Sequence, residues 1–202
     1  MTGIKLCGLS LPSEIGTVNR LKPDYIGFVF AKKSRRYITE EKAAELKRLL
    51  TPEIKAVGVF INEDMKTVAR LLKEGVIDIA QLHGTEDAAY VKRLREITGK
   101  AVIQAFCIGG RQDAALAESS VADYVILDSG AGSGRAFAWE LAQNIKRPYF
   151  LAGGLTPENV EEAIERLHPY AVDVSSGIET DGVKDQRKMA AFVAAVRKEG
   201  KL

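Results

Sequence analysis

A chain of 202 residues with 46% hydrophobic and 28% charged residues has the size and composition of one globular domain around one hydrophobic core. Its 29 basic and 27 acidic residues leave a formal net charge of +2, and no basic stripe with interleaved aromatic residues indicates a nucleic-acid partner. The first residues show no signal-peptide pattern, and no apolar run approaches the ~20 residues that span a bilayer. We therefore expect a cytoplasmic protein without a nucleic-acid or membrane partner.

Short apolar runs alternate with segments of helical period along the whole chain. The runs are rich in Val, Ile, Phe and Tyr, as strands buried on both faces are. We predict eight strands, at residues 4–8, 25–30, 56–60, 79–82, 102–106, 124–127, 149–151 and 171–174.

The segments between these strands are predicted to be helices. The third carries an apolar stripe at i, i+3, i+4 and i+7, formed by Met65, Val68, Ala69 and Leu72. Thr39 and Thr85 are typical of helix starts. The first helix, around residues 11–20, is expected to be short, and the fifth, around 112–117, to be brief.

Eight strand-then-helix units fit a single-domain (β/α)₈ TIM barrel over residues 1–202. A doubly wound open sheet is the alternative, because alternation of strands and helices does not by itself show that the sheet closes. The count of eight, with no element left over, favours the barrel.

Enzymes with this fold place reactive residues at the carboxyl ends of the strands and in the loops that follow. After the last two strands, glycines and hydroxyl groups gather at Gly153-Gly154 and Ser175-Ser176-Gly177. Glycines let backbone N–H groups approach an anion closely, and these two loops are where barrels commonly hold phosphate. We predict a phosphate site here, helped by a short extra helix within residues 178–185. A tight strand-to-helix turn is the alternative for the glycine pair.

Two further strand ends offer groups for proton transfer. Cys7 follows Lys5 on the same side of the first strand, and a nearby cation would lower the thiol pKa so that the thiolate acts as a base. Asp128 precedes the glycine-rich stretch 130–134, which we interpret as a lid. The alternatives are burial as a small hydrophobic residue for Cys7 and a turn or helix cap for Asp128.

Arg36 and His83 complete the candidate site. Arg36 offers a guanidinium fork for a carboxylate or phosphate, unless the basic segment 32–36 is only a solvated charge run. His83 is either a substrate-binding group or a core histidine with satisfied hydrogen bonds. Two distant histidines and two distant cysteines do not supply a metal site, so no metal is expected.

Strand parity predicts one ion pair inside the barrel. Lys5 shares a face with Cys7, and Asp173 shares a face with Ser175. In a closed barrel the first and eighth strands are neighbours. We therefore expect Lys5 and Asp173 to pair just below the site.

The ordered set of motifs resembles the phosphoribosylanthranilate isomerase family over nearly the whole chain. Glycine pairs after the seventh strand occur in many phosphate-binding barrels, so a single motif is weak evidence for one family. The ordered set of motifs is highly specific. The resemblance is carried by Lys5-Leu6-Cys7-Gly8-Leu9, by residues 24–30 with Ser34-Arg35-Arg36, by residues 57–60, by Gln81-Leu82-His83-Gly84, by Leu127-Asp128 with its glycine-rich loop, and by residues 151–160 and 172–179.

The resemblance implies an Amadori rearrangement in tryptophan biosynthesis that needs no cofactor. N-(5′-phosphoribosyl)anthranilate would become 1-(o-carboxyphenylamino)-1-deoxyribulose 5-phosphate, with Asp128 as general acid and Cys7 as general base. Arg36 would hold the anthranilate carboxylate. The expected partner is this small sugar phosphate, the chain being a monomer or a homodimer, with association with another pathway enzyme left open. The substrate-binding set would be Arg36, His83, Gly153, Gly154, Ser175, Ser176 and Gly177.

Other barrel functions fit the sequence less well. A pentose-phosphate epimerase would need metal-ligating His and Asp on several strand ends, and an indole-glycerol-phosphate synthase would need catalytic Lys and Glu there. A histidine-pathway aminoaldose carries phosphates at both ends and would need a second phosphate site. A sugar-phosphate sensor without activity is the alternative from another class. The chain departs from the family pattern at Ala138, Ala131 and Ser133, in and near the expected lid.

Overall fold

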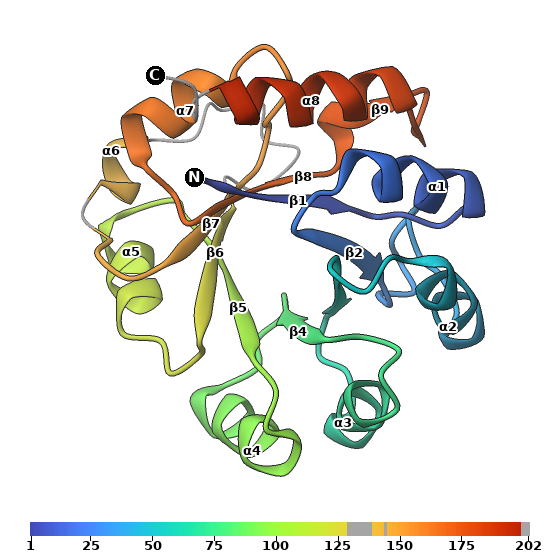
Figure 1. Cartoon of the computed structure of the whole chain (residues 1–202). Helices are drawn as coiled ribbons and strands as arrows, with labels where there is room; N and C mark the ends of the chain where they lie inside the picture. Colours follow the sequence, from blue (N-terminus) through green and yellow to red (C-terminus); the bar gives the residue numbers. More distant parts are fainter. Residues whose placement is uncertain (129–138, 144, 199–202) are drawn as a thin grey trace.

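The computed structural model describes residues 1–128, 139–143 and 145–198, and it shows a strand barrel surrounded by helices (Figure 1). Neighbouring strands pair in parallel, and β1 pairs with β8, so the sheet closes. This closure confirms the predicted (β/α)₈ barrel and excludes the open sheet. The barrel strands are β1 (Gly3–Cys7), β2 (Tyr25–Val29), β3 (Lys55–Phe60), β4 (Ile79–Leu82), β5 (Val102–Cys107), β6 (Tyr124–Asp128), β7 (Tyr149–Ala152) and β8 (Ala171–Val174).

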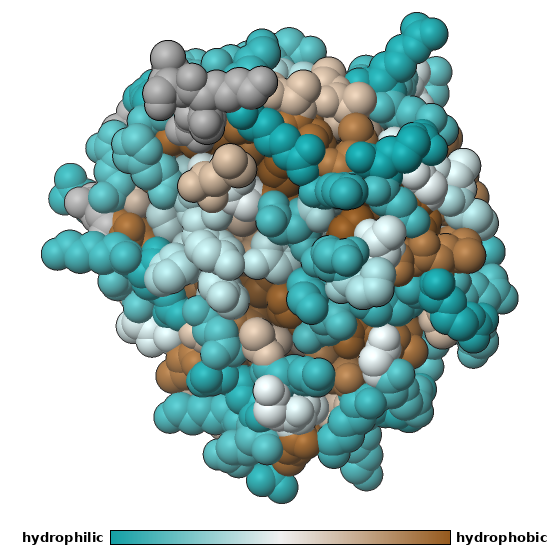
Figure 2. Space-filling model, in the orientation of Figure 1, coloured by the Kyte–Doolittle hydropathy of each residue, from teal (hydrophilic) through white to brown (hydrophobic). Residues whose placement is uncertain are grey.

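The helices cover the outside of the barrel with one apolar face each, and their other faces meet solvent. In α3, for example, Val68, Ala69 and Leu72 of the predicted stripe are buried. Hydrophilic residues predominate on the face seen in Figure 2. None of the helices in the described ranges is long and apolar enough to cross a membrane. The helices are α1 (Pro12–Leu21), α2 (Glu40–Leu49), α3 (Met65–Lys73), α4 (Ala88–Thr98), α5 (Arg111–Glu118), α6 (Trp139–Ala142), α7 (Val160–Leu167) and α8 (Gln186–Lys198).

Two details of the helices differ from expectation. Helix α1 is not short, because it has ten residues, as many as α2. The side chain of Glu14 accepts hydrogen bonds from the backbone N–H groups of Ser10 and Leu11, which stabilises its start. Thr39 caps α2 as predicted, but α4 is capped by Asp87 and not by Thr85, whose backbone N–H and hydroxyl both donate to Asn62.

The segment after β8 forms a hairpin instead of the predicted helix. A single 3₁₀ turn, η1 (Ser176–Ile178), leads into β9 (Glu179–Thr180) and β10 (Val183–Lys184), which pair antiparallel. Asp181 and Gly182 between them have φ values of 53° and 81°. An Asp-Gly pair with both φ values positive is the favoured two-residue hairpin turn, and this local preference overrides a helix.

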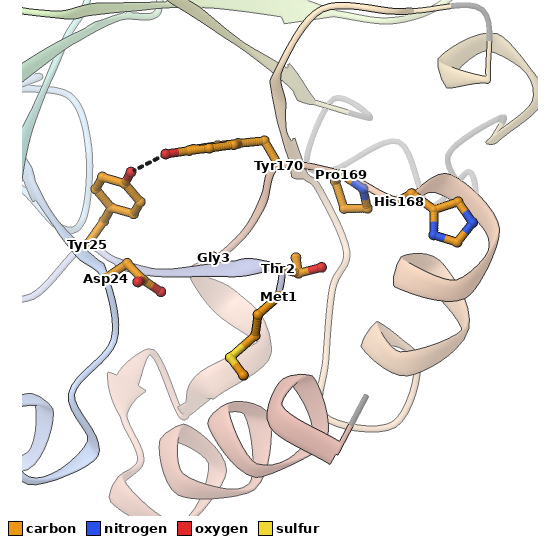
Figure 3. Close-up of a pocket in the computed structure, with 8 residues that line it drawn as sticks. All are labelled: Met1, Thr2, Gly3, Asp24, Tyr25, His168, Pro169 and Tyr170. Carbon is orange, nitrogen blue, oxygen red and sulfur yellow. Dashed lines mark hydrogen bonds between the residues drawn. The ribbon is translucent and has the colours of Figure 1, made fainter. Parts of the chain in front are cut away.

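The interior of the barrel is filled by side chains, and its amino-terminal end is closed by aromatic rings. Phe150 packs edge-on against Tyr25 and Tyr124, with ring centroids 5.3 Å and 5.8 Å apart, and lies 5.7 Å from Tyr170. The hydroxyl groups of Tyr25 and Tyr170 are hydrogen-bonded at 3.0 Å (Figure 3). We call these four residues the aromatic floor.

Candidate active site

Two hollows lie at opposite ends of the barrel, and only one of them carries the predicted chemistry. The larger, about 720 Å³, lies where β1 and β2 begin and is lined by Met1, Asp24, Tyr25 and His168 among others (Figure 3). The other, about 190 Å³, lies at the carboxyl ends of the strands. It is lined by Cys7, Val29, Ser34, Arg36, Val59, Gln81, His83, Asp128, Ala152, Gly153, Gly154, Leu155, Asp173, Val174, Ser175 and Ser176. The candidate active site is therefore the smaller cavity.

Cys7, the last residue of β1, is buried and reaches the cavity beside a glycine of the neighbouring strand. Gly27 of β2 is its register partner, and a Cβ atom there would lie 2.5 Å from the Cys7 sulfur. Burial raises the pKa of the Cys7 thiol, because a thiolate loses its hydration there, while Lys5 and Lys184 act to lower it. The predicted lowering of this pKa is thus wrong in net direction, although the neighbouring cation is present.

The predicted pair of Lys5 and Asp173 is confirmed. Lys5 is fully buried, and its Nζ donates to Asp173 Oδ1 at 2.9 Å and to Gln81 Oε1 at 2.9 Å. Burial disfavours the ammonium ion, but the Asp173 carboxylate more than offsets this and raises the pKa of Lys5. The ammonium form of Lys5 is therefore favoured beside Cys7.

Asp128 ends β6, and His83 of the loop after β4 lies next to it. His83 Nε2 is 3.6 Å from Asp128 Oδ2, and the two side chains are 36% and 17% exposed. His83 Nδ1 lies 3.2 Å from Gln81 Nε2. His83 therefore lines the cavity and is not a core histidine.

Arg36 is held over the cavity by the hairpin that follows β8. Its Nε and Nη2 donate to the two carboxylate oxygens of Glu179 at 2.6 Å and 2.7 Å. Lys184, on the other strand of the hairpin, donates to the same carboxylate at 2.6 Å and to the carbonyl of Ser175 at 2.9 Å. Burial raises the pKa of Glu179, but the hydrogen bonds from both cations outweigh it and keep that pKa below its ordinary value. Arg36 is thus not part of a solvated charge run.

The predicted phosphate loops meet at one side of the cavity. Gly153 and Gly154 have φ values of 91° and 67°, which favour glycine and agree with the tight-turn alternative. Phosphate binding by this turn stays a prediction. Ser175 and Ser176 line the cavity with them. Gly177 does not line it, because it packs against the backbone carbonyl of Leu155, where a Cβ atom would clash.

The described residues include no cluster of three or more His, Cys, Asp or Glu side chains that could hold a metal ion. The glycine-rich stretch 130–134, interpreted above as a lid, lies outside them, as do Ala131, Ser133 and Ala138.

Comparison with known proteins gives this site its context. A family model described as N-(5'-phosphoribosyl)anthranilate (PRA) isomerase matches residues 4–195. The chain belongs to the phosphoribosylanthranilate isomerase family. A relative from Endomicrobium trichonymphae with that name is 40% identical, over 98% of this chain and 99% of its own length. One from Lacticaseibacillus casei BL23 is 42% identical over 98% and 96% of the two chains.

Solved structures of phosphoribosylanthranilate isomerases have the same architecture. The Thermotoga maritima structure superposes with a TM-score of 0.89 at 32% identity, covering 98% of this chain and all of the other. A second structure, at 31% identity, TM-score 0.87 and the same coverage, is a complex with reduced 1-(o-carboxyphenylamino)-1-deoxyribulose 5-phosphate. A third, at 32% identity, TM-score 0.88 and again the same coverage, describes monomers generated from the dimeric T. maritima enzyme.

Three residues of the site received no role in the sequence analysis: Gln81 and Glu179 stood within quoted motifs, and Lys184 lay within the segment 178–185 expected to be helical. Gln81 shares strand parity with His83, a signal that places both on the cavity side of β4. Glu179 pairs with Arg36, and Lys184 pairs with Glu179 across the hairpin. Reading Asp181-Gly182 as a hairpin signal would have brought these two side chains to one face.

Proposed function

We propose that this chain converts N-(5′-phosphoribosyl)anthranilate into 1-(o-carboxyphenylamino)-1-deoxyribulose 5-phosphate, with Asp128 as general acid and Cys7 as general base. The reaction belongs to tryptophan biosynthesis. The observation that supports these roles is that both groups line one cavity from strands three steps apart in the barrel order, β6 and β1. An acid and a base so placed reach different atoms of one small substrate.

The proposed chemistry needs only proton transfers. Asp128 gives its proton to the furanose ring oxygen as the C1′–O bond breaks, and the nitrogen lone pair forms an iminium. The Cys7 thiolate then removes the C2′ proton, and the C–H electrons become the C1′=C2′ bond of an enolamine while the iminium π electrons return to nitrogen. Protonation of C1′ and loss of the hydroxyl proton at C2′ give the ketone. A thiol whose pKa is raised is a stronger base, and Lys5 and Lys184 favour its thiolate.

The two anionic ends of the substrate have separate binding groups in this proposal. Gly153, Gly154, Ser175 and Ser176 bind the phosphate, and Arg36 binds the anthranilate carboxylate. Glu179 accepts from Nε and from one hydrogen of Nη2. The second hydrogen of Nη2 and the Nη1 group face the other edge of the guanidinium, where no carboxylate of the described residues is bound, and this edge binds the anthranilate carboxylate. Gly177 acts indirectly, since its close packing on Leu155 sets the distance between the two phosphate loops. His83, which lies beside Asp128, contacts the substrate as well in this proposal.

The decisive experiment follows the fluorescence decay of phosphoribosylanthranilate generated in situ. We expect Cys7→Ala and Asp128→Asn each to lower kcat by about 10²–10⁴-fold with circular dichroism unchanged, as loss of a general acid or base does. Cys107→Ala, which removes the exposed second cysteine, should keep full activity. A folded wild-type protein that binds the reduced product but gives only the spontaneous decay would instead be a sugar-phosphate sensor.

We further propose a cytoplasmic enzyme, as its two free cysteines suit a reducing compartment. Its assembly is a monomer or a homodimer, which sedimentation velocity at several concentrations distinguishes. Association with another pathway enzyme would appear as a larger species when the two are mixed.

A further inference from the structure

A chain of side-chain contacts runs from below Cys7 on β1, through β4, to Asp128 on β6. Lys5 Nζ donates to Gln81 Oε1 at 2.9 Å. Gln81 Nε2 lies 3.2 Å from His83 Nδ1, and His83 Nε2 lies 3.6 Å from Asp128 Oδ2. This series of side-chain contacts therefore connects Lys5, which lies beside the proposed base, to the proposed acid.

The chemistry of these groups allows one assignment of the protons. An ammonium ion has donors and no acceptor, so the atom of Gln81 that faces Lys5 must be the carbonyl oxygen. The amide nitrogen of Gln81, which only donates, must then face His83. His83 Nδ1 therefore accepts, and in a neutral imidazole the single N–H lies on Nε2, the nitrogen nearest to Asp128.

We infer that Gln81, oriented by Lys5, is a positioning residue that fixes His83 in the Nε2–H tautomer and makes it a hydrogen-bond donor toward Asp128. The inference rests on the proposed acid role of Asp128. When that carboxyl loses its proton, a directed N–H stabilises the carboxylate formed. The opposite tautomer would direct a lone pair at the same oxygen and repel it. At 3.6 Å the partial charge on the N–H acts on the carboxylate electrostatically, and a small approach of the two side chains would complete the hydrogen bond.

Imidazole nitrogen NMR tests the tautomer directly, and the chain suits it because it has only two histidines. In ¹⁵N-histidine-labelled protein at about pH 9, where an ordinary imidazole is neutral, the two-bond couplings to the ring protons distinguish the protonated nitrogen. A His168→Gln variant assigns the spectra. We expect His83 to be protonated at Nε2. Protonation at Nδ1 in the wild type would overturn the inference.

Gln81→Glu is the matched variant, since it keeps the shape and replaces the donor by an acceptor. One carboxylate oxygen keeps the contact with Lys5, and the other then accepts from His83, so the His83 tautomer should reverse to Nδ1–H while the His168 signals stay unchanged. We expect kcat to fall about tenfold and KM to stay within twofold. Gln81→Leu, which has neither donor nor acceptor, should give a mixture of both tautomers. An unchanged His83 spectrum in both variants would contradict the role of Gln81.

The two proposals fail in different ways. Full activity of Asp128→Asn with the expected tautomer in the wild type would refute the acid role and leave the tautomer assignment in place. Loss of activity in Asp128→Asn together with an unchanged tautomer in Gln81→Glu would refute the role of Gln81 alone.

Discussion

At Cys7, two physical effects of opposite sign act on one sulfur atom. Burial takes water away from the thiolate and raises the pKa, while the ammonium groups of Lys5 and Lys184 lower it. Burial is the largest of these effects, the Asp173 carboxylate adds to it, and the net shift of the pKa is upward. A residue can therefore have a cation two positions away in the strand and still hold its proton more tightly than a free thiol.

The sign of this shift predicts the pH dependence of Cys7 reactivity. Only the thiolate is alkylated, and a raised pKa moves its formation to higher pH, so in a Cys107→Ser background the iodoacetamide reaction should have its midpoint above the ordinary thiol value of about 8.5. The rising limb of kcat/KM should follow the same pH range, because the base must be deprotonated. N-acetylcysteine is the reference and a Cys7→Ala/Cys107→Ser protein the blank. A midpoint below that of the reference would contradict the prediction.

Sequence parity predicted where these residues lie but not how deeply they are buried. The pairing of Lys5 with Asp173 follows from alternation along two strands that become neighbours when the barrel closes. The pKa of Cys7 does not follow, because it depends on the number of atoms packed around the sulfur, including the space left by Gly27 on the next strand. The sequence predicts which side chains share one face of a strand. It does not predict how densely atoms from neighbouring strands pack around one of them.

At the scale of one element, the β9–β10 hairpin holds two of the proposed substrate-binding residues, Arg36 and Ser175, through side-chain hydrogen bonds. Glu179 binds Arg36 and Lys184 together, and Lys184 also donates to the carbonyl of Ser175 in the phosphate loop. The carboxylate thus lies between two cations that would otherwise repel each other. Through it, the expected binding groups for the two anionic ends of the substrate are linked.

Glu179→Gln should therefore weaken substrate binding more than it slows the chemistry. An amide presents one acceptor instead of two charged oxygens, so Arg36 loses a bidentate, charge-assisted pair. We expect KM to rise about tenfold and kcat to change less than threefold in the fluorescence assay. Glu158→Gln, an exposed carboxylate on the loop after β7, is the matched control and should leave both constants unchanged. Equal losses in kcat and kcat/KM would show that Glu179 acts in the transition state instead.

The hairpin also shows where prediction from sequence fails. A helix was expected within residues 178–185 because barrels commonly carry one after the eighth strand. The local signal, Asp181-Gly182, favours a two-residue turn, and both residues have positive φ in the structure. Strand limits, by contrast, agree to within one residue. Most of these strands are buried on nearly every residue, so each appears in the sequence as a short continuous apolar run with clear ends.

At the scale of the whole molecule, the barrel is tied across its interior by a buried polar cluster. Lys5 of β1 contacts Asp173 of β8 and Gln81 of β4. The pair with Asp173 lies at the seam where the first and last strands meet. The ion pair therefore joins the two strands whose pairing closes the barrel.

Lys5→Met should destabilise the protein strongly, because it leaves the Asp173 carboxylate buried without a counterion. Breaking a buried pair on one side typically costs about 3–5 kcal/mol, whereas apolar replacement of both partners is often neutral. We expect urea unfolding to report a loss in this range for Lys5→Met and a recovery of most of it in Lys5→Met/Asp173→Leu. A single variant that loses less than about 1 kcal/mol would show that the pair does not hold the seam.

The aromatic floor and the candidate active site lie at opposite ends of the barrel and share no residue. Tyr25, Tyr124, Phe150 and Tyr170 seal one end by ring packing, and none of them lines the catalytic cavity. Substitutions in the loops at the other end therefore leave this ring packing unchanged. Such substitutions can alter substrate preference without altering the packing that closes the barrel. The 3-hexulose-6-phosphate synthase of Salmonella typhimurium, only 18% identical, still superposes with a TM-score of 0.75. The ring packing at one end and the loops at the other are thus separate parts of the barrel, and a change in the loops does not require a change in the rings.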